Sequence, residues 1–293
     1  MIKLDAINAL DRAAFVARLG NIYEHAPWVA EAAHSSAPFS TVAALFAALA
    51  QAVCNASDAQ RLALIAGHPE LGDKLALAKP LTTESQSEQQ GAGLDQLSGA
   101  EFDIFTRLNR AYRDKFAFPF IICVRRHSKD SILAGFQKRL EHDRETEIQA
   151  ALTEIDRIAT LRVGGLVAAD ATLKLDGQVS THVLDTHGGT PAVGVAISLH
   201  ELSRLAPPRL IARSLSNADG RTDPPLIAGK PVPIGQYEMR FEMGPYFATR
   251  GIASAEPPFL ATVPVRFGVA DPEAHYHVPL LVTPWSYTTY RGR

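Results

Sequence analysis

The most constraining feature of this sequence is the uneven distribution of its prolines. Of the 19 prolines, five lie before residue 165 and fourteen lie after it. A proline inside a helix removes a hydrogen bond and clashes with the preceding turn, whereas turns and strand edges tolerate it. A chain of 293 residues is long enough for two domains. The asymmetry therefore predicts a helical domain first and a strand-rich domain second.

The first half carries the start signals and the apolar spacing of helices. Ser57–Gln60 and Ser98–Glu101 both match the capping box, in which the first and fourth residues satisfy each other's backbone amides. After the second box, apolar residues recur at steps of three or four, at Phe102, Phe105, Leu108, Tyr112 and Phe116. Residues 143–162 show the same spacing. We predict an all-α helical N-terminal domain over residues 1–165.

The second half alternates apolar and small or polar residues with the period of two that is typical of half-buried strands. Val193, Val195, Ile197 and Leu199 are expected to face one way, and Tyr237–Phe241 and Val263–Phe267 show the same period, with Pro264 favouring an edge strand. Turn signals such as Gly188-Gly189 separate these runs. We predict an all-β antiparallel sandwich over residues 176–293, joined to the helices by a short linker at about 166–175.

Composition excludes several classes of protein. The net charge of −2 gives no field that would recruit nucleic acid or anionic lipid. The two cysteines, Cys54 and Cys123, have no metal-type spacing and favour a reducing compartment. The longest apolar stretch, Val42–Val53, is too short to span a bilayer, and acidic residues interrupt the N-terminal apolar pattern, unlike a secretory signal. We expect a cytoplasmic protein with no nucleic-acid or membrane partner.

Ionisable residues mark three segments of the second half. They are a predicted strand with His182, a tight turn with Arg221, and a terminal segment with His277 followed by several tyrosines. Each alone is compatible with a structural histidine or a surface charge. Together, residues 176–293 resemble the 5-hydroxyisourate hydrolases, the transthyretin-related enzymes of urate degradation. The resemblance is carried by Val179–Thr186, by Gly189–Val195 and by the terminal Tyr-Arg-Gly.

This resemblance implies a transthyretin-like fold, a homotetramer in which paired subunits line the site, and no metal or cofactor. It implies His182 and His277 as proton-transfer groups, Arg221 as the cation that holds the developing oxyanion, and Tyr290 as a substrate-binding residue. The pair His275 and His277 is spaced like zinc ligands, but no third ligand follows at a suitable spacing. The family usually ends in serine, whereas this chain ends in Arg293. The competing interpretation is a transthyretin-like carrier, which a polar channel disfavours.

Three features of the first half form a second constellation. His68-Pro69 follows a helix through Gly67, Ser85–Gly91 is a polar run, and Phe118–Val124 is an apolar run broken by Pro119. In this order they resemble the 2-oxo-4-hydroxy-4-carboxy-5-ureidoimidazoline (OHCU) decarboxylases, over about residues 5–165. The resemblance implies His68 as the catalytic acid, with Glu88 holding its tautomer or the substrate hydroxyl. It implies as substrate-binding residues Pro69, Ser85, Gln89, Arg162 and the backbone of Phe120, Ile122 and Val124.

The two activities are consecutive, so each resemblance supports the other. A hydrolase would open 5-hydroxyisourate to OHCU, and a decarboxylase would convert OHCU to (S)-allantoin without an external electron sink. We therefore expect a bifunctional homo-oligomeric enzyme, with dimer contacts through the helical domain and tetramer contacts through the β domain. The alternative is a chain in which only one domain is catalytically active and the other serves binding or oligomerisation.

Overall fold

The change in sequence pattern near residue 165 coincides with a change from helices to strands, as predicted. The structure is a computed structural model that describes residues 1–71, 83–91, 94, 97–252 and 255–292. The chain divides into two compact units. The first comprises Met1–Arg125 with Ile132–Leu175, and the second comprises Arg126–Ser131 with the chain from Asp176 onward.

The first unit is helical. Its helices are α1 (Leu4–Asn8), α2 (Arg12–Leu19), α3 (Pro27–Ala33), α4 (Val42–Cys54), α5 (Asp58–Ala66), α6 (Thr83–Gly91), α7 (Gly99–Phe116), α8 (Lys129–Arg139) and α9 (Arg144–Leu166), with short 3₁₀ turns at His34–Ser36 and Val124–Arg126. The last residue of the second turn and the first three residues of α8 belong to the second unit. Within the described residues, no single helix is both long and apolar enough to cross a membrane, and α4 and α5 pass that test only as a pair bent by 110°.

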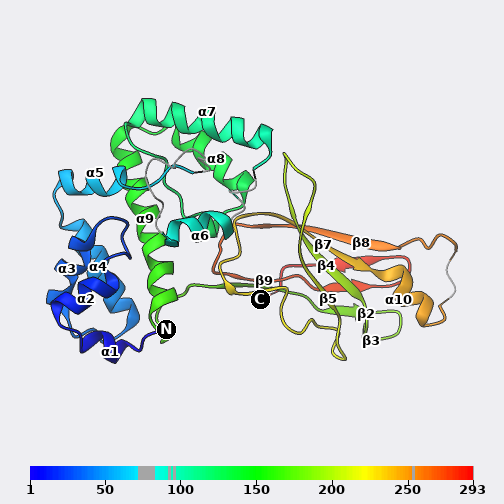
Figure 1. Ribbon diagram of the computed structural model, residues 1–293. Helices are drawn as coiled ribbons and strands as arrows, with labels where there is room; N and C mark the ends of the chain where they lie inside the picture. Colours follow the sequence, from blue (N-terminus) through cyan, green and yellow to red (C-terminus); the bar gives the residue numbers. More distant parts are fainter. Residues whose placement is uncertain (72–82, 92–93, 95–96, 253–254, 293) are drawn as a thin grey trace. The chain divides into compact units, whose positions relative to one another are not determined.

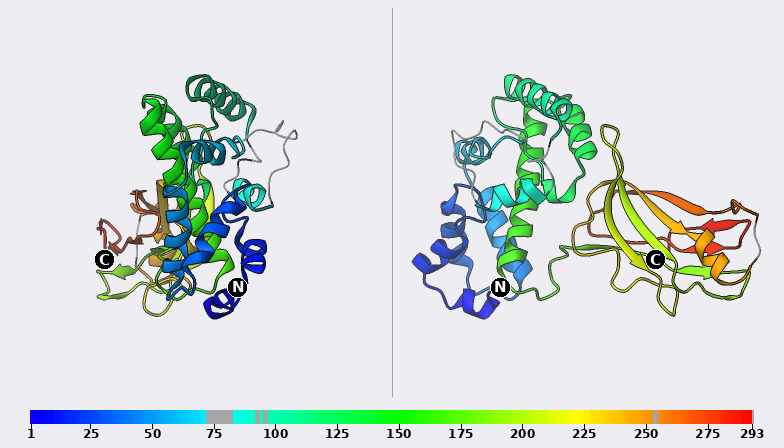
Figure 2. Two further views of the ribbon diagram at one scale, coloured as in Figure 1. Left: turned by 90° about the vertical axis from the view of Figure 1, so that its left-hand side faces the viewer. Right: turned by 45° about the vertical axis from the view of Figure 1, so that its right-hand side comes forward.

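Local sequence signals determine where several of these helices begin and end. Both predicted capping boxes are present, at Ser57 before α5 and at Ser98 before α7. Of the predicted apolar stripe of α7, Phe105, Tyr112 and Phe116 are fully buried. α7 ends where Ala117 adopts a left-handed conformation, two residues before Pro119. α9 runs through the unit, with α1 to α4 beside its C-terminal half and α7 and α8 beside its N-terminal half (Figures 1 and 2).

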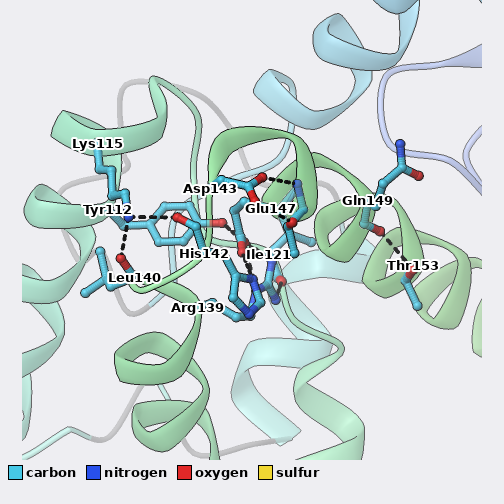
Figure 3. A network of polar contacts seen from close by, with 11 residues as sticks. Tyr112, Lys115, Ile121, Arg139, Leu140, His142, Asp143, Glu147, Gln149 and Thr153 are labelled. Atoms are coloured by element: carbon cyan, nitrogen blue, oxygen red, sulfur yellow. Dashed lines mark hydrogen bonds and ion pairs between the residues drawn. The ribbon is translucent and has the colours of Figure 1, made fainter.

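A buried polar network connects α7, α8 and α9 (Figure 3). Glu147 is fully buried, and its Oε1 accepts hydrogen bonds from Arg139 Nε at 2.8 Å, from Arg139 Nη2 at 2.5 Å and from the Tyr112 hydroxyl. Its Oε2 lies 2.8 Å from His142 Nδ1. Arg139 also donates through Nη1 to the carbonyl of Ile121 at 2.6 Å. The network therefore fixes the backbone that follows Pro119 to the helices.

We expect Glu147→Gln to lower the free energy of unfolding of the helical unit by about 3 kcal/mol. The change removes one member of a buried ion pair and leaves the Arg139 guanidinium without its counter-charge, which costs more than the pair contributes. Chemical denaturation followed by far-ultraviolet circular dichroism measures the change. Glu145→Gln on the exposed side of the same helix turn is the matched control and should stay within about 0.5 kcal/mol. Equal effects of the two substitutions would contradict this role of Glu147.

The second unit is built on strands. They are β1 (Gly177–Ser180), β2 (Val183–Asp185), β3 (Thr190–Pro191), β4 (Ala196–Leu202), β5 (Arg209–Leu215), β6 (Ile227–Lys230), β7 (Gly235–Glu242), β8 (Thr262–Val269), β9 (His275–His277), β10 (Leu280–Val282) and β11 (Tyr287–Thr289), and α10 (Met243–Thr249) lies between β7 and β8. One sheet has the order β5-β4-β7-β8, and two smaller ones have the orders β6-β1-β9 and β11-β10-β2-β3. Their inner faces enclose a core of Val, Leu, Phe and Tyr side chains.

The all-β fold is confirmed, but three details of the prediction are wrong. The sandwich is mixed rather than antiparallel, because β9 runs parallel to β1 and β10 runs parallel to β2. Val193 is 45% exposed, because β4 begins only at Ala196 and the preceding residues turn. His182 lies between β1 and β2 rather than within a strand. The edge position expected from Pro264 is confirmed, since β8 ends its sheet.

Candidate active sites

His68 owes its position to the end of α5. That helix ends at Ala66, Gly67 caps it, and the next residue is His68. The imidazole is buried, and its Nδ1 lies 2.9 Å from the carbonyl oxygen of Leu64. A carbonyl only accepts hydrogen bonds, so Nδ1 carries a proton and Nε2 is the nitrogen left for a ligand. The tautomer is thus set by Leu64, and not by Glu88, for which this was one of the two predicted roles.

The charge state of His68 reflects opposing influences. Burial is the largest of them and lowers the pKa of the imidazole below its ordinary value of 6.5, because a charged ring is poorly solvated there. The Leu64 carbonyl and the carboxylate of Glu24 act in the opposite direction, while the positive charges of Arg162 and His25 lower the pKa further. An anionic ligand beside the ring would raise the pKa of His68, as the Leu64 carbonyl and Glu24 do, and would favour the protonated acid.

α6 presents its polar residues to the same place. Ser85, Glu88 and Gln89 are three and four positions apart and share one side of the helix. Glu88 binds Arg162 of α9 through two hydrogen bonds, from Nε to Oε1 and from Nη2 to Oε2, both at 3.1 Å. Ser85 Oγ accepts from Arg162 Nη2 at 3.0 Å. Since the Arg162 guanidinium binds both Glu88 and Ser85, charge-assisted hydrogen bonds connect α6 to α9 here.

The segment after Pro119, Phe120–Val124, forms an apolar wall of the site. Its backbone is fixed on both sides, because the Ile121 carbonyl accepts from Arg139 and the Cys123 N–H donates to Glu154 Oε2 at 2.9 Å. The Cys123 amide is therefore already occupied by a protein partner. Glu154 and Arg139 hold the backbone of this wall in place and were absent from the sequence-based set of site residues.

These elements line a small cavity of the helical unit. All nine residues predicted for this half line it, namely His68, Pro69, Ser85, Glu88, Gln89, Phe120, Ile122, Val124 and Arg162. Leu71, Ile121, Cys123, Arg125 and Ile158 complete the lining. A basic fork, two acceptor side chains and a buried histidine facing an apolar wall are suited to orienting a small polar anion.

The sequence-based set did not include Glu24, which is 2% exposed and contacts two of the lining residues, Ser85 and Arg162. Its Oε2 accepts hydrogen bonds from Ser85 Oγ at 2.6 Å and from Arg162 Nη2 at 3.0 Å. The one available signal was a glutamate beside the apolar residues Ile22 and Tyr23. That signal gives no hint of partners that lie 61 and 138 residues away in the chain.

In the β unit, a tight turn places Arg221 beside His182. The two residues form an isolated antiparallel bridge, and the Val183 N–H donates to the Gly220 carbonyl at 2.8 Å. Gly220 has a φ of +73°, and a Cβ there would lie 2.4 Å from the Val183 carbonyl oxygen. The turn predicted at this point is confirmed, and only glycine permits its close approach to the histidine segment.

His277 reaches the same region from β9, where it pairs with Ser180 at the end of β1. The Ser180 hydroxyl oxygen lies 2.9 Å from His277 Nδ1 and 2.6 Å from His275 Nε2. Ser180 and His275 were not among the predicted site residues, although the spacing of His275 from His277 is that of zinc ligands. Because Ser180 contacts Nδ1 of His277, Nε2 is the nitrogen of this ring that remains available for a ligand.

Burial and the charge of Arg221 act on both predicted histidines. Burial lowers the pKa of His277 below 6.5, and the positive charges of Arg221, His275 and His182 lower it further. Burial and Arg221 also lower the pKa of His182, whose ring is hydrogen-bonded to the backbone of Asp219. Within the described part of the chain, His182 Nε2 is buried without a hydrogen-bond partner. Both imidazoles are therefore held in the neutral form in which one nitrogen is a base.

The predicted role of Tyr290 depends on the end of the chain. Tyr290 is 57% exposed, and two residues later the backbone of Gly292 pairs with His277, donating its N–H to the His277 carbonyl at 2.9 Å. The Tyr-Arg-Gly segment therefore passes along the histidine cluster. Arg293, the departure from the usual terminal serine, lies outside the described residues.

The buried cavity of the helical unit and the His-Arg cluster of the β unit define a two-domain enzyme with two polar sites. Comparison with known proteins assigns both halves. A family model for OHCU decarboxylases matches residues 8–164, and a model for the HIUase/Transthyretin family matches residues 179–292. The chain therefore belongs to the OHCU decarboxylase family in its helical half and to the HIUase/Transthyretin family in its β half.

Individual relatives agree with this assignment. The chain is 43% identical over 162 residues to the OHCU decarboxylase of Haloferax volcanii, covering 55% of this chain and 94% of that protein. It is 46% identical over 118 residues to the 5-hydroxyisourate hydrolase of Halalkalibacterium halodurans, covering 40% of this chain and 99% of that protein. A crystal structure of an (S)-allantoin synthase covers 100% of both chains with 36% identity and a TM-score of 0.54.

Proposed function

We propose that this chain is a bifunctional enzyme of urate degradation. The β unit hydrolyses 5-hydroxyisourate to OHCU, and the helical unit decarboxylates OHCU to (S)-allantoin. The observation that carries the proposal is that one chain holds both sites, each with its expected acid–base and cationic groups, and matches an (S)-allantoin synthase over its whole length. The unstable product of the first reaction is the substrate of the second, which is a chemical reason to join them.

In the decarboxylation, the bond between the ring carbon and the carboxylate breaks and CO₂ leaves. The electron pair forms a double bond to the adjacent carbon of the C=N group, and the negative charge passes to the ring nitrogen, so the ring itself is the electron sink. His68 then gives the proton on Nε2 to that adjacent carbon, which bears the ureido group, and is left neutral. The hydroxyl group on the carbon that lost CO₂ gives its proton to the ring nitrogen and becomes the carbonyl group of allantoin. We assign the orientation of the substrate to Glu88, Gln89, Ser85 and Arg162 on one side and to the apolar wall on the other. Because His68 stands on one face of the cavity, protonation on that face alone gives a single enantiomer.

In the hydrolysis, His277 takes a proton from water through Nε2, and the water oxygen bonds to the acyl carbon of the ring. The negative charge that develops on the carbonyl oxygen is stabilised by the guanidinium of Arg221. The ring C–N bond then breaks, and the nitrogen receives a proton from the imidazolium. We assign His182 to the substrate site through its position beside Arg221, and Tyr290 to substrate binding from the terminal segment.

We propose further that the β unit assembles into a homotetramer in which paired subunits complete the hydrolytic site. In support, eight of the nine exposed large apolar residues of the described chain follow residue 192, namely Val193, Leu205, Leu210, Leu215, Phe259, Trp285, Tyr287 and Tyr290. Three of these lie in the terminal segment beside His277. Exposed apolar groups that lie close together, as Trp285, Tyr287 and Tyr290 do in the sequence, are typical of surfaces that are covered by other subunits.

The proposed function is tested with freshly generated 5-hydroxyisourate and the full chain. Loss of the substrate absorbance reports hydrolysis, and circular dichroism of the product reports chiral allantoin. We expect the substrate absorbance to fall and the circular dichroism signal of allantoin to follow it, both at rates that scale with enzyme concentration. Hydrolysis without a chiral product would restrict the chain to the first reaction. The absence of both signals would contradict the proposal altogether.

A further inference from the structure

Glu24 is a buried acid that the mechanism above does not use. It lies in the segment between the end of α2 at Leu19 and the start of α3 at Pro27. Only 2% of its surface is exposed. A carboxylate at such a depth is costly unless charged or hydrogen-bonding groups compensate it, so its partners indicate what it stabilises.

Two of its partners are side chains of the decarboxylase cavity. Glu24 Oε2 accepts from Ser85 Oγ at 2.6 Å and from Arg162 Nη2 at 3.0 Å. Arg162 Nη2 also donates to Ser85 Oγ at 3.0 Å, so Glu24, Ser85 and Arg162 are all hydrogen-bonded to one another in the interior. Ser85 and Arg162 line the cavity and Glu24 does not, so Glu24 reaches the cavity only through these two side chains.

Charged groups of both signs surround the cavity. Arg162 is paired with two carboxylates, Glu24 at 3.0 Å and Glu88 at 3.1 Å, and Arg125 is a second cation in the lining. The other groups that act on the His68 ring are His25 from the same segment as Glu24 and the Leu64 carbonyl of α5. The negative charge of Glu24 favours the protonated form of His68, whereas the charges of Arg162 and His25 oppose it.

We propose, on the basis of the decarboxylase function argued above, that Glu24 is a positioning residue of this site. Its carboxylate holds the guanidinium of Arg162 and the hydroxyl of Ser85 in the orientation that receives substrate, and its charge favours the protonated form of His68. Glu24 touches neither substrate nor reacting atoms. It acts through the three residues that do.

This role explains an otherwise unfavourable arrangement. A buried, neutral imidazole has no proton to give from Nε2, and burial favours that neutral state. A fixed negative charge behind Arg162 offsets part of this effect before substrate arrives, and the anionic substrate adds to it. Removing the charge while keeping the shape should therefore affect proton delivery more than substrate affinity.

The experiment compares Glu24→Gln with Glu24→Asp in the full chain, using OHCU released from 5-hydroxyisourate by added hydrolase. For Glu24→Gln we expect kcat for decarboxylation to fall by at least about tenfold with a smaller change in KM. We also expect the alkaline limb of the pH profile of kcat/KM to move to lower pH, because His68 loses its proton more readily. Glu24→Asp keeps the charge, so its alkaline limb should stay where the unchanged enzyme has it, even if kcat falls.

Glu101→Gln is the matched control. Glu101 is a buried glutamate of the same unit, but it serves the capping box of α7, where glutamine can replace it. We expect its kcat and pH profile to be unchanged. If the unchanged enzyme decarboxylates OHCU and the profiles of both Glu24 variants coincide with its own, or both move alike, the role of Glu24 is overturned. If the unchanged enzyme has no decarboxylase activity, the proposed function fails instead.

Discussion

Replacing His68 with asparagine should slow the decarboxylation of OHCU by about 10² to 10⁴-fold in kcat while leaving 5-hydroxyisourate hydrolysis intact. The reason is that Nε2 of His68 is the one nitrogen of this imidazole that the Leu64 carbonyl leaves available, so its loss removes the proton that ends the reaction. The product of hydrolysis would then decay without the enzyme. Circular dichroism should show racemic allantoin forming slowly, although the absorbance of 5-hydroxyisourate still disappears at the normal rate.

His34→Asn is the control for this experiment. His34 belongs to the same helical unit, but it follows α3 and contacts the Leu10 carbonyl, away from the cavity. It should retain chiral product formation at close to the normal rate. A His68→Asn variant that still made chiral allantoin at that rate would show that another group delivers the proton.

The sequence allowed most of the decarboxylase cavity to be predicted, because its parts follow local rules or family motifs. The helix end at Gly67 places His68 in the cavity, the polar side of α6 appears in the spacing of Ser85, Glu88 and Gln89, and Pro119 marks where the wall begins. Glu24 could not be predicted in the same way. Its partners are brought to it by the packing of α6 and α9, and neither periodicity nor a motif near residue 24 contains that information.

The β unit shows a similar limit. Alternation identifies strands and their buried faces, and the pairing of β4, β7 and β8 places Tyr237, Met239 and Phe241 inside as expected. It does not determine which strands become neighbours. The parallel pairing of β1 with β9 joins residues almost a hundred positions apart, and only this pairing places Ser180 against His277. The relation of His275 to the site was therefore visible only in the structure.

The second large effect is expected at His277. Replacing it with asparagine should slow the hydrolysis of 5-hydroxyisourate by about 10² to 10⁴-fold in kcat and leave the decarboxylation of supplied OHCU unchanged. His277 is the histidine whose Nδ1 is engaged by Ser180, which leaves Nε2 to accept a proton from water. Stopped-flow loss of 5-hydroxyisourate absorbance measures the first step, and chiral allantoin formed from OHCU measures the second.

The pH profile distinguishes a base from a group that only fills space. Burial first, and then the charges of Arg221, His275 and His182, hold the pKa of His277 below 6.5, so its neutral form persists as the pH falls through that value. We expect kcat/KM for hydrolysis to stay level from neutral pH to below 6.5, to decline only at the lowered pKa, and to lose this acid limb in His277→Asn. His200→Asn, on β4 outside the cluster, should keep both the rate and the limb. A His277→Asn variant with residual activity and the same acid limb would move the base to His182, because that imidazole is the other one whose pKa Arg221 lowers in this cluster of the described chain.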